Sequence, residues 1–171
     1  LLHSVEEGNN YDAYVKYNCF EWAMEKKDKG QIKHFGFSFH GSPALLEKIL
    51  SEHPEVEFVQ VQINYADWNN PIVHSGELYK ILRKYNMPII IMEPVKGGML
   101  ANTIPELEAM MRKQQPNRSI ASWAFRFVGS LDNVMTILSG MSNEEQMKDN
   151  LETFINFEPL NDKDKEGLDE V

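Results

Sequence analysis

Two loops in the sequence combine residue types that can hold an anion. In the first (EPVKGG, residues 93–98), the glycines allow close approach of the backbone and Lys96 offers an ammonium group. The second (GMSN, residues 140–143) leads into a predicted helix whose first backbone N–H groups form a natural anion site. A turn with an exposed lysine is the alternative for the first loop.

Polar side chains also mark the ends of two predicted strands. In the run EFVQVQINY (residues 57–65), the alternation of a strand places Gln60, Gln62 and Asn64 on one face. Ser38 closes the preceding predicted strand, residues 31–38. A hydroxyl that caps a turn is the alternative for Ser38, and an inward polar side chain satisfied within the fold is the alternative for Gln62.

The elements that must position these residues alternate between helix and strand. Apolar periodicity indicates where these elements lie. Gly30 ends one helix, and Ser42 followed by Pro43 begins the next. The predicted helices are residues 11–28, one that begins at Pro43, 77–85, 116–128 and 143–154, and the predicted strands are a stub that ends at His3, 31–38, 57–65, 87–92 and 134–138.

This alternation is typical of βα units around a parallel sheet. Right-handed crossovers then leave two common folds, the doubly wound open sheet and the barrel. An open sheet that binds a dinucleotide should carry a G-x-G-x-x-G run after its first strand, and the sequence contains no such run. The pattern therefore favours a barrel.

The composition of the 171 residues excludes some functions. A net charge of -9 disfavours nucleic-acid binding, which needs a clustered positive surface. Cys19 is the only cysteine, so an intrachain disulfide and an all-cysteine metal site are excluded, which suits a reducing, cytoplasmic compartment. His34, His53 and His74 lack metal-ligand spacing relative to each other. No apolar run approaches the length of a membrane span.

Both ends of the sequence predict a segment of a longer protein. Leu1-Leu2-His3 is typical of the last residues of a buried strand, and residues 161–171 carry a helix cap after which the sequence stops. We expect residues 1–171 to be a single domain segment, and no second domain is visible.

Four motifs in this order resemble strands five to eight of the aldo-keto reductase barrel. They are GFSFH (36–40), VQINY (61–65), MEPVKGGML (92–100) and LSGMSN (138–143), with Asn150 in the last helix. The branch that often carries an iron–sulfur extension is the most similar one. The resemblance implies an α/β fold, the (β/α)8 TIM barrel, of which this chain covers the end of strand 4 to helix 8.

Carried over to this chain, the resemblance gives His3 the place of the catalytic histidine that orients and polarises the substrate carbonyl. Ser38 and Gln62 match the side chains that recognise the nicotinamide carboxamide, which offers one acceptor and two donors. The asparagine that usually follows the serine is Phe39 here. The aspartate, tyrosine and lysine of the family's catalytic tetrad lie in its first half and have no counterpart in this chain.

The remaining family positions imply a nicotinamide dinucleotide, NADP or NAD. Met92 stands where many members have an aromatic ring against the nicotinamide, and Lys96 and Gly97 match the pyrophosphate loop. Gly140 and Gln146 replace the cations that bind the 2′-phosphate of NADP, which weakens the case for NADP. Asn150 matches the asparagine that faces adenine. An iron–sulfur cluster is implied only for a C-terminal extension beyond this chain.

The resemblance predicts an oxidoreductase that moves a hydride between NAD(P) and a small-molecule carbonyl or alcohol. A non-catalytic dinucleotide-binding barrel that acts as a sensor or regulatory subunit is the alternative. We expect the partner of this segment to be the N-terminal half-barrel or, in its absence, a second copy of the segment. Without the rest of the tetrad, the isolated segment is expected to be inactive.

Overall fold

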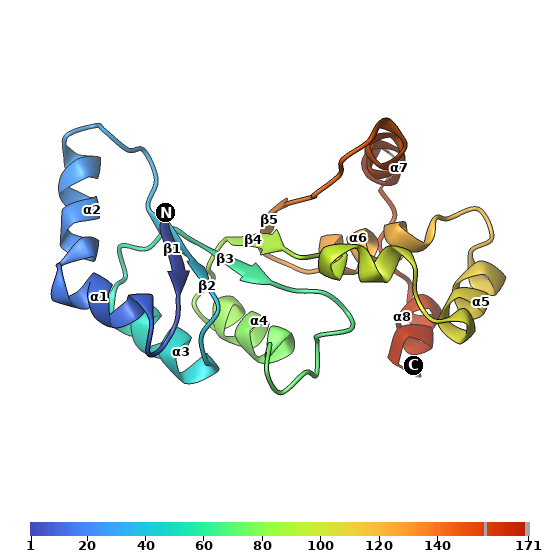
Figure 1. The fold of residues 1–171 in the computed structure, drawn as a ribbon, viewed down its shortest axis with the longest axis horizontal. Coiled ribbons are helices and arrows are strands. Elements are labelled where there is room, and N and C mark those ends of the chain that lie inside the picture. The colour runs from blue at the N-terminus through green and yellow to red at the C-terminus, as the bar shows by residue number, and fades with distance from the viewer. Residues whose placement is uncertain (156, 170–171) are drawn as a thin grey trace.

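A five-stranded sheet forms the centre of the computed structural model, which describes residues 1–155 and 157–169 (Figure 1). Every neighbouring pair of strands is parallel, and the strands lie in the sheet in the order of the sequence. The parallel βα architecture is therefore confirmed. The strands are β1 (Leu2–Val5), β2 (Gly36–Phe39), β3 (Phe58–Gln62), β4 (Ile89–Met92) and β5 (Val134–Ile137).

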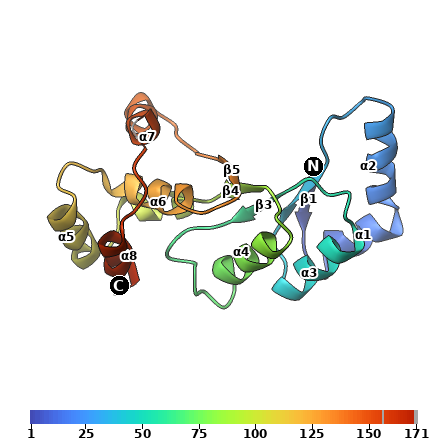
Figure 2. The same ribbon diagram turned by 180° about the vertical axis from the view of Figure 1, so that it is seen from behind.

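Helices follow each strand, and none in the described residues is long and apolar enough to cross a bilayer. The helices are α1 (Asn10–Lys16), α2 (Cys19–Asp28), α3 (Pro43–Glu52), α4 (Ser75–Lys84), the 3-10 helix η1 (Lys96–Ala101), α5 (Pro105–Gln114), α6 (Ile120–Gly129), α7 (Glu144–Ile155) and α8 (Asp162–Asp169). Helices α1, α2 and α3 gather around β1 and β2, whereas α5 and α8 lie together at the opposite end of the molecule (Figures 1 and 2).

The two faces of the sheet differ in what covers them. On one face, Val59, Val61, Ile89 and Ile91 are fully buried in the core that α3 and α4 help to form. On the other face, the side chains of β3 and β4 are only half-buried, and they are those of Phe58, Gln60, Gln62, Ile90 and Met92. Ser38 pairs in register with Gln60, so it lies on this second, more polar face.

The predicted helix 11–28 is helical in the structure but is divided into two helices, because the chain bends between α1 and α2. Asn18 has a φ of 50°, in the left-handed region that asparagine tolerates better than other side chains. The predicted strand 31–38 is too long at its start. The backbone N–H of Gln31 donates to the Lys26 carbonyl at 2.9 Å and so closes α2, and the strand begins only at Gly36.

Helix α5 was absent from the predicted elements, although Pro105 stands at its first turn. The predicted helix 116–128 begins later, at Ile120, because the Ser119 hydroxyl accepts from the backbone N–H of Ser122 at 3.1 Å and caps it. The predicted run 57–65 likewise ends as a strand at Gln62. The other predicted ends lie within two residues of those in the structure.

Two predicted helix caps are confirmed. Ser42 accepts from the backbone N–H of Leu45 at 3.2 Å, with Pro43 as the first residue of α3. Asn161 Oδ1 accepts from the backbone N–H of Asp164 at 2.9 Å at the start of α8. The last residues of the predicted C-terminal segment, 170 and 171, lie outside the described residues.

Candidate functional site

His3 and Ser38 lie opposite each other on β1 and β2, beside a β-bulge in β1. Leu2 pairs with Phe37 and Val5 with Phe39, so two residues of β1 oppose Ser38 alone. The Ser38 hydroxyl accepts from the backbone N–H of Ser4 at 2.8 Å, and its oxygen lies 3.5 Å from Nδ1 of His3, at the long end of a hydrogen bond.

Gln62 and Met92 lie side by side at the carboxyl ends of β3 and β4, where they pair in register. Gln62 Nε2 donates to Oδ2 of Asp67 at 2.9 Å, and Gln60 Nε2 lies 3.4 Å from the Met92 sulfur. Both predicted side chains therefore occupy the more polar face of the sheet, at the end where barrel proteins hold their ligands.

A cavity of about 640 Å³ opens beside the end of β4. Its walls come from the loop after β4, from Ala121 and Phe125 of α6, and from the segment that leads from β5 into α7. Five residues predicted to hold a cofactor line this cavity. They are Met92, Gly97, Gly140, Gln146 and Asn150.

Hydrogen bonds order the segment between β5 and α7 on the rim of this cavity. Gln146 Oε1 accepts from the backbone N–H of Ser142 at 2.7 Å, and Asn143 Oδ1 accepts from the backbone N–H of Gln146 at 2.9 Å. Asn150 Nδ2 donates to the Ser139 hydroxyl at 2.9 Å. The start of α7 and both of its predicted ligand-binding side chains thus face the loop that borders the cavity.

Asp67 is a site residue that sequence reasoning missed. Its side chain is fully buried, and it is ion-paired with Lys96 of the loop after β4. Burial raises the pKa of the Asp67 carboxyl, but the hydrogen bonds from Lys96, Asn64 and Gln62 outweigh burial and lower it overall. The spacing Asn64-x-x-Asp67 was the available signal, since these two residues close a hydrogen-bonded turn.

The predicted residues form two neighbouring groups, one that lines the cavity and one that lies on the polar face of the sheet and the loop after β4. Met92 belongs to both, since it pairs with Gln62 and lines the cavity. His3, Ser38, Gln62 and Lys96 are outside the cavity's lining, and Lys96 is held by Asp67. Across the described residues, no group of three or more His, Cys, Asp or Glu side chains could hold a metal ion.

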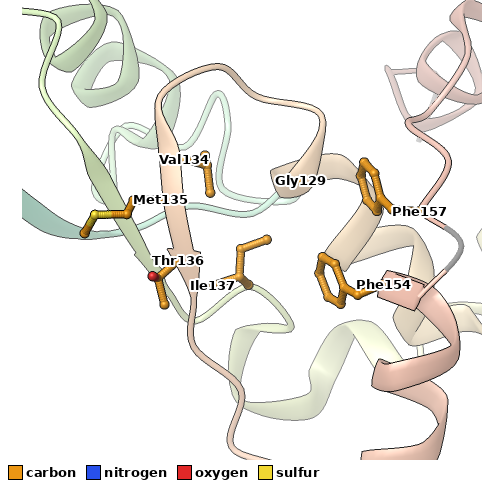
Figure 3. Close-up of a pocket in the computed structure, with 7 residues that line it drawn as sticks. All are labelled: Gly129, Val134, Met135, Thr136, Ile137, Phe154 and Phe157. Carbon is orange, nitrogen blue, oxygen red and sulfur yellow. The ribbon is translucent and has the colours of Figure 1, made fainter.

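A second cavity, of about 420 Å³, lies against the edge strand β5 (Figure 3). The rings of Phe154 and Phe157 stack with their centroids 5.7 Å apart and face the strand. Among the described residues its lining holds no ionisable side chain, and consists of Gly129, Val134, Met135, Thr136, Ile137, Phe154 and Phe157. This apolar wall offers no group for acid–base or anion chemistry, so we place the candidate site at the larger cavity.

A parallel sheet that carries its cavity and polar side chains at the carboxyl ends of the strands is the arrangement of ligand-binding α/β proteins, barrels among them. The chain belongs to the aldo/keto reductase family, whose family model matches residues 3–171. No curated protein matches the sequence.

Solved structures of aldo-keto reductases share this fold. The holo form of AKR11C1 from Bacillus halodurans has a TM-score of 0.73 at 19% identity, with 99% of this chain and 59% of that protein covered. The glycerol dehydrogenase AKR11B4 from Gluconobacter oxydans has a TM-score of 0.70 at 16% identity, with 98% and 56% covered. The chain thus spans less than two thirds of these relatives, and matches them as a partial (β/α)8 barrel.

Proposed function

We propose that this chain is the dinucleotide-binding part of an aldo-keto-reductase-like oxidoreductase that acts on a small carbonyl or alcohol. The observation that carries the proposal is the shared cavity. Met92, Gly97, Gly140, Gln146 and Asn150, from two segments far apart in the sequence, line one space. Its volume of about 640 Å³ lies within the range of about 300–1,000 Å³ that is typical of cofactor pockets.

The residues present fit a nicotinamide dinucleotide, NAD or NADP. The start of α7 offers backbone N–H groups for phosphate oxygens besides those of Ser142 and Gln146, which bond to side chains of the same segment, and Asn150 and Gln146 offer hydrogen bonds at the rim. Met92 supplies an apolar thioether against a ring, and the neighbouring Gln62 Oε1 and Ser38 Oγ supply acceptors for the NH2 group of a carboxamide. A bound nicotinamide would supply the hydride.

His3 is the residue that we assign to the substrate carbonyl. A neutral His3 whose Nδ1 accepts from the Ser38 hydroxyl carries its proton on Nε2. Nε2–H can then donate to a carbonyl oxygen as negative charge develops on it. The tyrosine that donates the proton, with its lysine and aspartate, would come from the N-terminal half of the barrel, so the intact protein is the active species.

Titration of the intact protein with NADH and NADPH, followed by energy transfer from tryptophan, tests the proposal. Gly140→Trp places an indole in the cavity and should abolish binding, whereas Asn117→Trp adds the same bulk to an exposed loop and should leave binding unchanged. Absence of binding by the wild-type protein would refute the proposal. Binding without turnover of any aldehyde or ketone would favour the alternative of a dinucleotide sensor or regulatory subunit.

A further inference from the structure

The loop after β4 is held in a strained conformation. Glu93 and Lys96 have φ values of 54° and 50°, and Gly97 and Gly98 follow with 62° and 93°. Glycine adopts such angles freely, but a residue with a side chain does so at a cost in free energy. Two non-glycine residues in this region therefore require contacts that hold them there.

Asn64 and Asp67 contact this loop, and each of them binds one of its two strained non-glycine residues. Asn64 Nδ2 donates to the backbone carbonyl of Glu93 at 3.1 Å, and Asp67 is ion-paired with Lys96 Nζ. The two residues also lock each other, since Asn64 Nδ2 donates to Asp67 Oδ2 and the Asp67 N–H donates to Asn64 Oδ1, both at 2.9 Å. Both side chains are fully buried, so water does not compete for these bonds.

The same carboxylate fixes the orientation of Gln62. A carboxylate only accepts hydrogen bonds, so the Gln62 amide must turn its Nε2 toward Asp67, 2.9 Å away. Oε1 is then the end of the amide that faces away from Asp67. A nicotinamide carboxamide beside Met92 would meet Gln62 as an acceptor for its NH2 group.

We propose that Asp67 is a positioning residue for the dinucleotide site. It holds Lys96 and the strained loop on one side, and it presents Gln62 as an acceptor on the other. This inference rests on the proposed function, because it assigns Asp67 a role in the affinity of that site. Asp67 itself acts through Lys96 and Gln62 and does not touch the ligand.

The test compares Asp67→Asn with Asp164→Asn in the intact protein. Asp164 is also buried and is ion-paired with Arg118 at 3.2 Å, but it lies at the start of α8, outside the cavity lining. Both variants lose a buried carboxylate. We expect the Kd for NADH to rise about tenfold in Asp67→Asn, the scale of one lost charged hydrogen bond, and to stay within about twofold in Asp164→Asn.

Limited proteolysis of the protein without ligand measures how firmly the loop is held. Trypsin cleaves after lysine, so the rate of cleavage at Lys96 reports how firmly the loop is held. Asp67→Asn should be cut at Lys96 roughly tenfold faster than the wild type, and Asp164→Asn should not. An unchanged Kd with unchanged cleavage would overturn the inference. A wild-type protein that binds neither NADH nor NADPH would instead overturn the proposed function, and with it the role of Asp67 in affinity.

Discussion

The hydroxyl of Ser38 accepts a hydrogen bond from the backbone N–H of Ser4 at 2.8 Å, and so holds the bulge that follows His3 in β1. Ser38 is 1% exposed. Its hydroxyl thus has a structural task that does not depend on any ligand, in addition to the place beside Met92 and Gln62 that we propose for it.

The first prediction concerns this bond. Ser38→Ala leaves the N–H of Ser4 without its acceptor, so we expect a loss of about 1–3 kcal/mol in the free energy of unfolding. Denaturation in urea measures it. In the control Ser51→Ala, the lost hydroxyl is exposed and bonds the Lys48 carbonyl on α3, so the change should stay within about 0.5 kcal/mol. Equal losses in the two variants would contradict a buried role for Ser38.

The second prediction is that NADH binds about tenfold more tightly than NADPH. Glu93 and Asp149 are the ionisable side chains in the described lining of the cavity, and no lysine or arginine is among the lining residues. The 2′-phosphate of NADPH would bring further negative charge, about -1.5 to -2, toward these carboxylates.

A positive charge added to the cavity wall should reverse the preference for NADH over NADPH. Gln146→Arg puts a cation on the cavity wall and should improve NADPH binding more than NADH binding. Asn117→Arg adds the same charge to an exposed loop outside the lining and serves as the control. Tighter binding of NADPH than of NADH by the wild-type protein would show that the phosphate meets a cation from elsewhere in the intact barrel.

The third prediction concerns acid stability. The hydrogen bonds from Lys27 and from the backbone N–H of Phe35, at 2.7 and 2.8 Å, lower the pKa of Glu57 from 4.5 to about 2. Its stabilising effect is therefore complete above pH 4.5 and is lost as the pH falls toward 2. Because 33% of the side chain is exposed, solvent screens the effect and we expect it to be modest.

Glu57→Gln should consequently be less stable than the wild type at pH 7, and the two should converge as the pH falls toward 2. Thermal denaturation at a series of pH values measures the difference. Glu21→Gln removes an exposed carboxylate of α2 and should follow the wild-type curve throughout. A constant difference between Glu57→Gln and the wild type from pH 7 to pH 2 would argue against the ionised carboxylate as the cause.

Local patterns in the sequence predicted the strands, because alternation and apolar runs depend on neighbouring residues. They also predicted the cap at Ser42. The break at Asn18 was missed because the apolar pattern continues across it, while α5 was missed although Pro105 and the acidic Glu106 and Glu108 marked its first turn.

The contents of the site were less predictable than the elements. Family positions pointed to Gln62 and Lys96, but the carboxylate that binds both does not follow from spacing alone. Asp67 is 29 residues from Lys96, and the two meet only because β3 and β4 are neighbours in the sheet. The ion pair is therefore a consequence of the fold, and only the positions of its members could be read from the sequence.

The last prediction is that the isolated 171-residue chain shows no reductase turnover and either self-associates or is partly unfolded. Strands β1 and β5 each pair with a single neighbour in the sheet, so both edges carry backbone groups open to further pairing. In β5 and directly after it, Met135 is 57% and Leu138 41% exposed, which leaves apolar surface in water. Each such side chain, left in water, loses roughly 1.5–3 kcal/mol of the free energy that its burial would contribute. The net free energy of unfolding of a protein is only about 5–15 kcal/mol.

Sedimentation velocity and an NAD(P)H oxidation assay on the isolated chain test the two parts separately. Addition of the N-terminal half of the barrel should remove the self-association, because its strands would pair with β1 and β5 and cover the polar face that holds Gln60 and Gln62. Turnover should return only with that half, since His3 alone supplies no proton donor of the tyrosine type. A stable monomer with reductase activity would show that the chain is a complete enzyme of a different design.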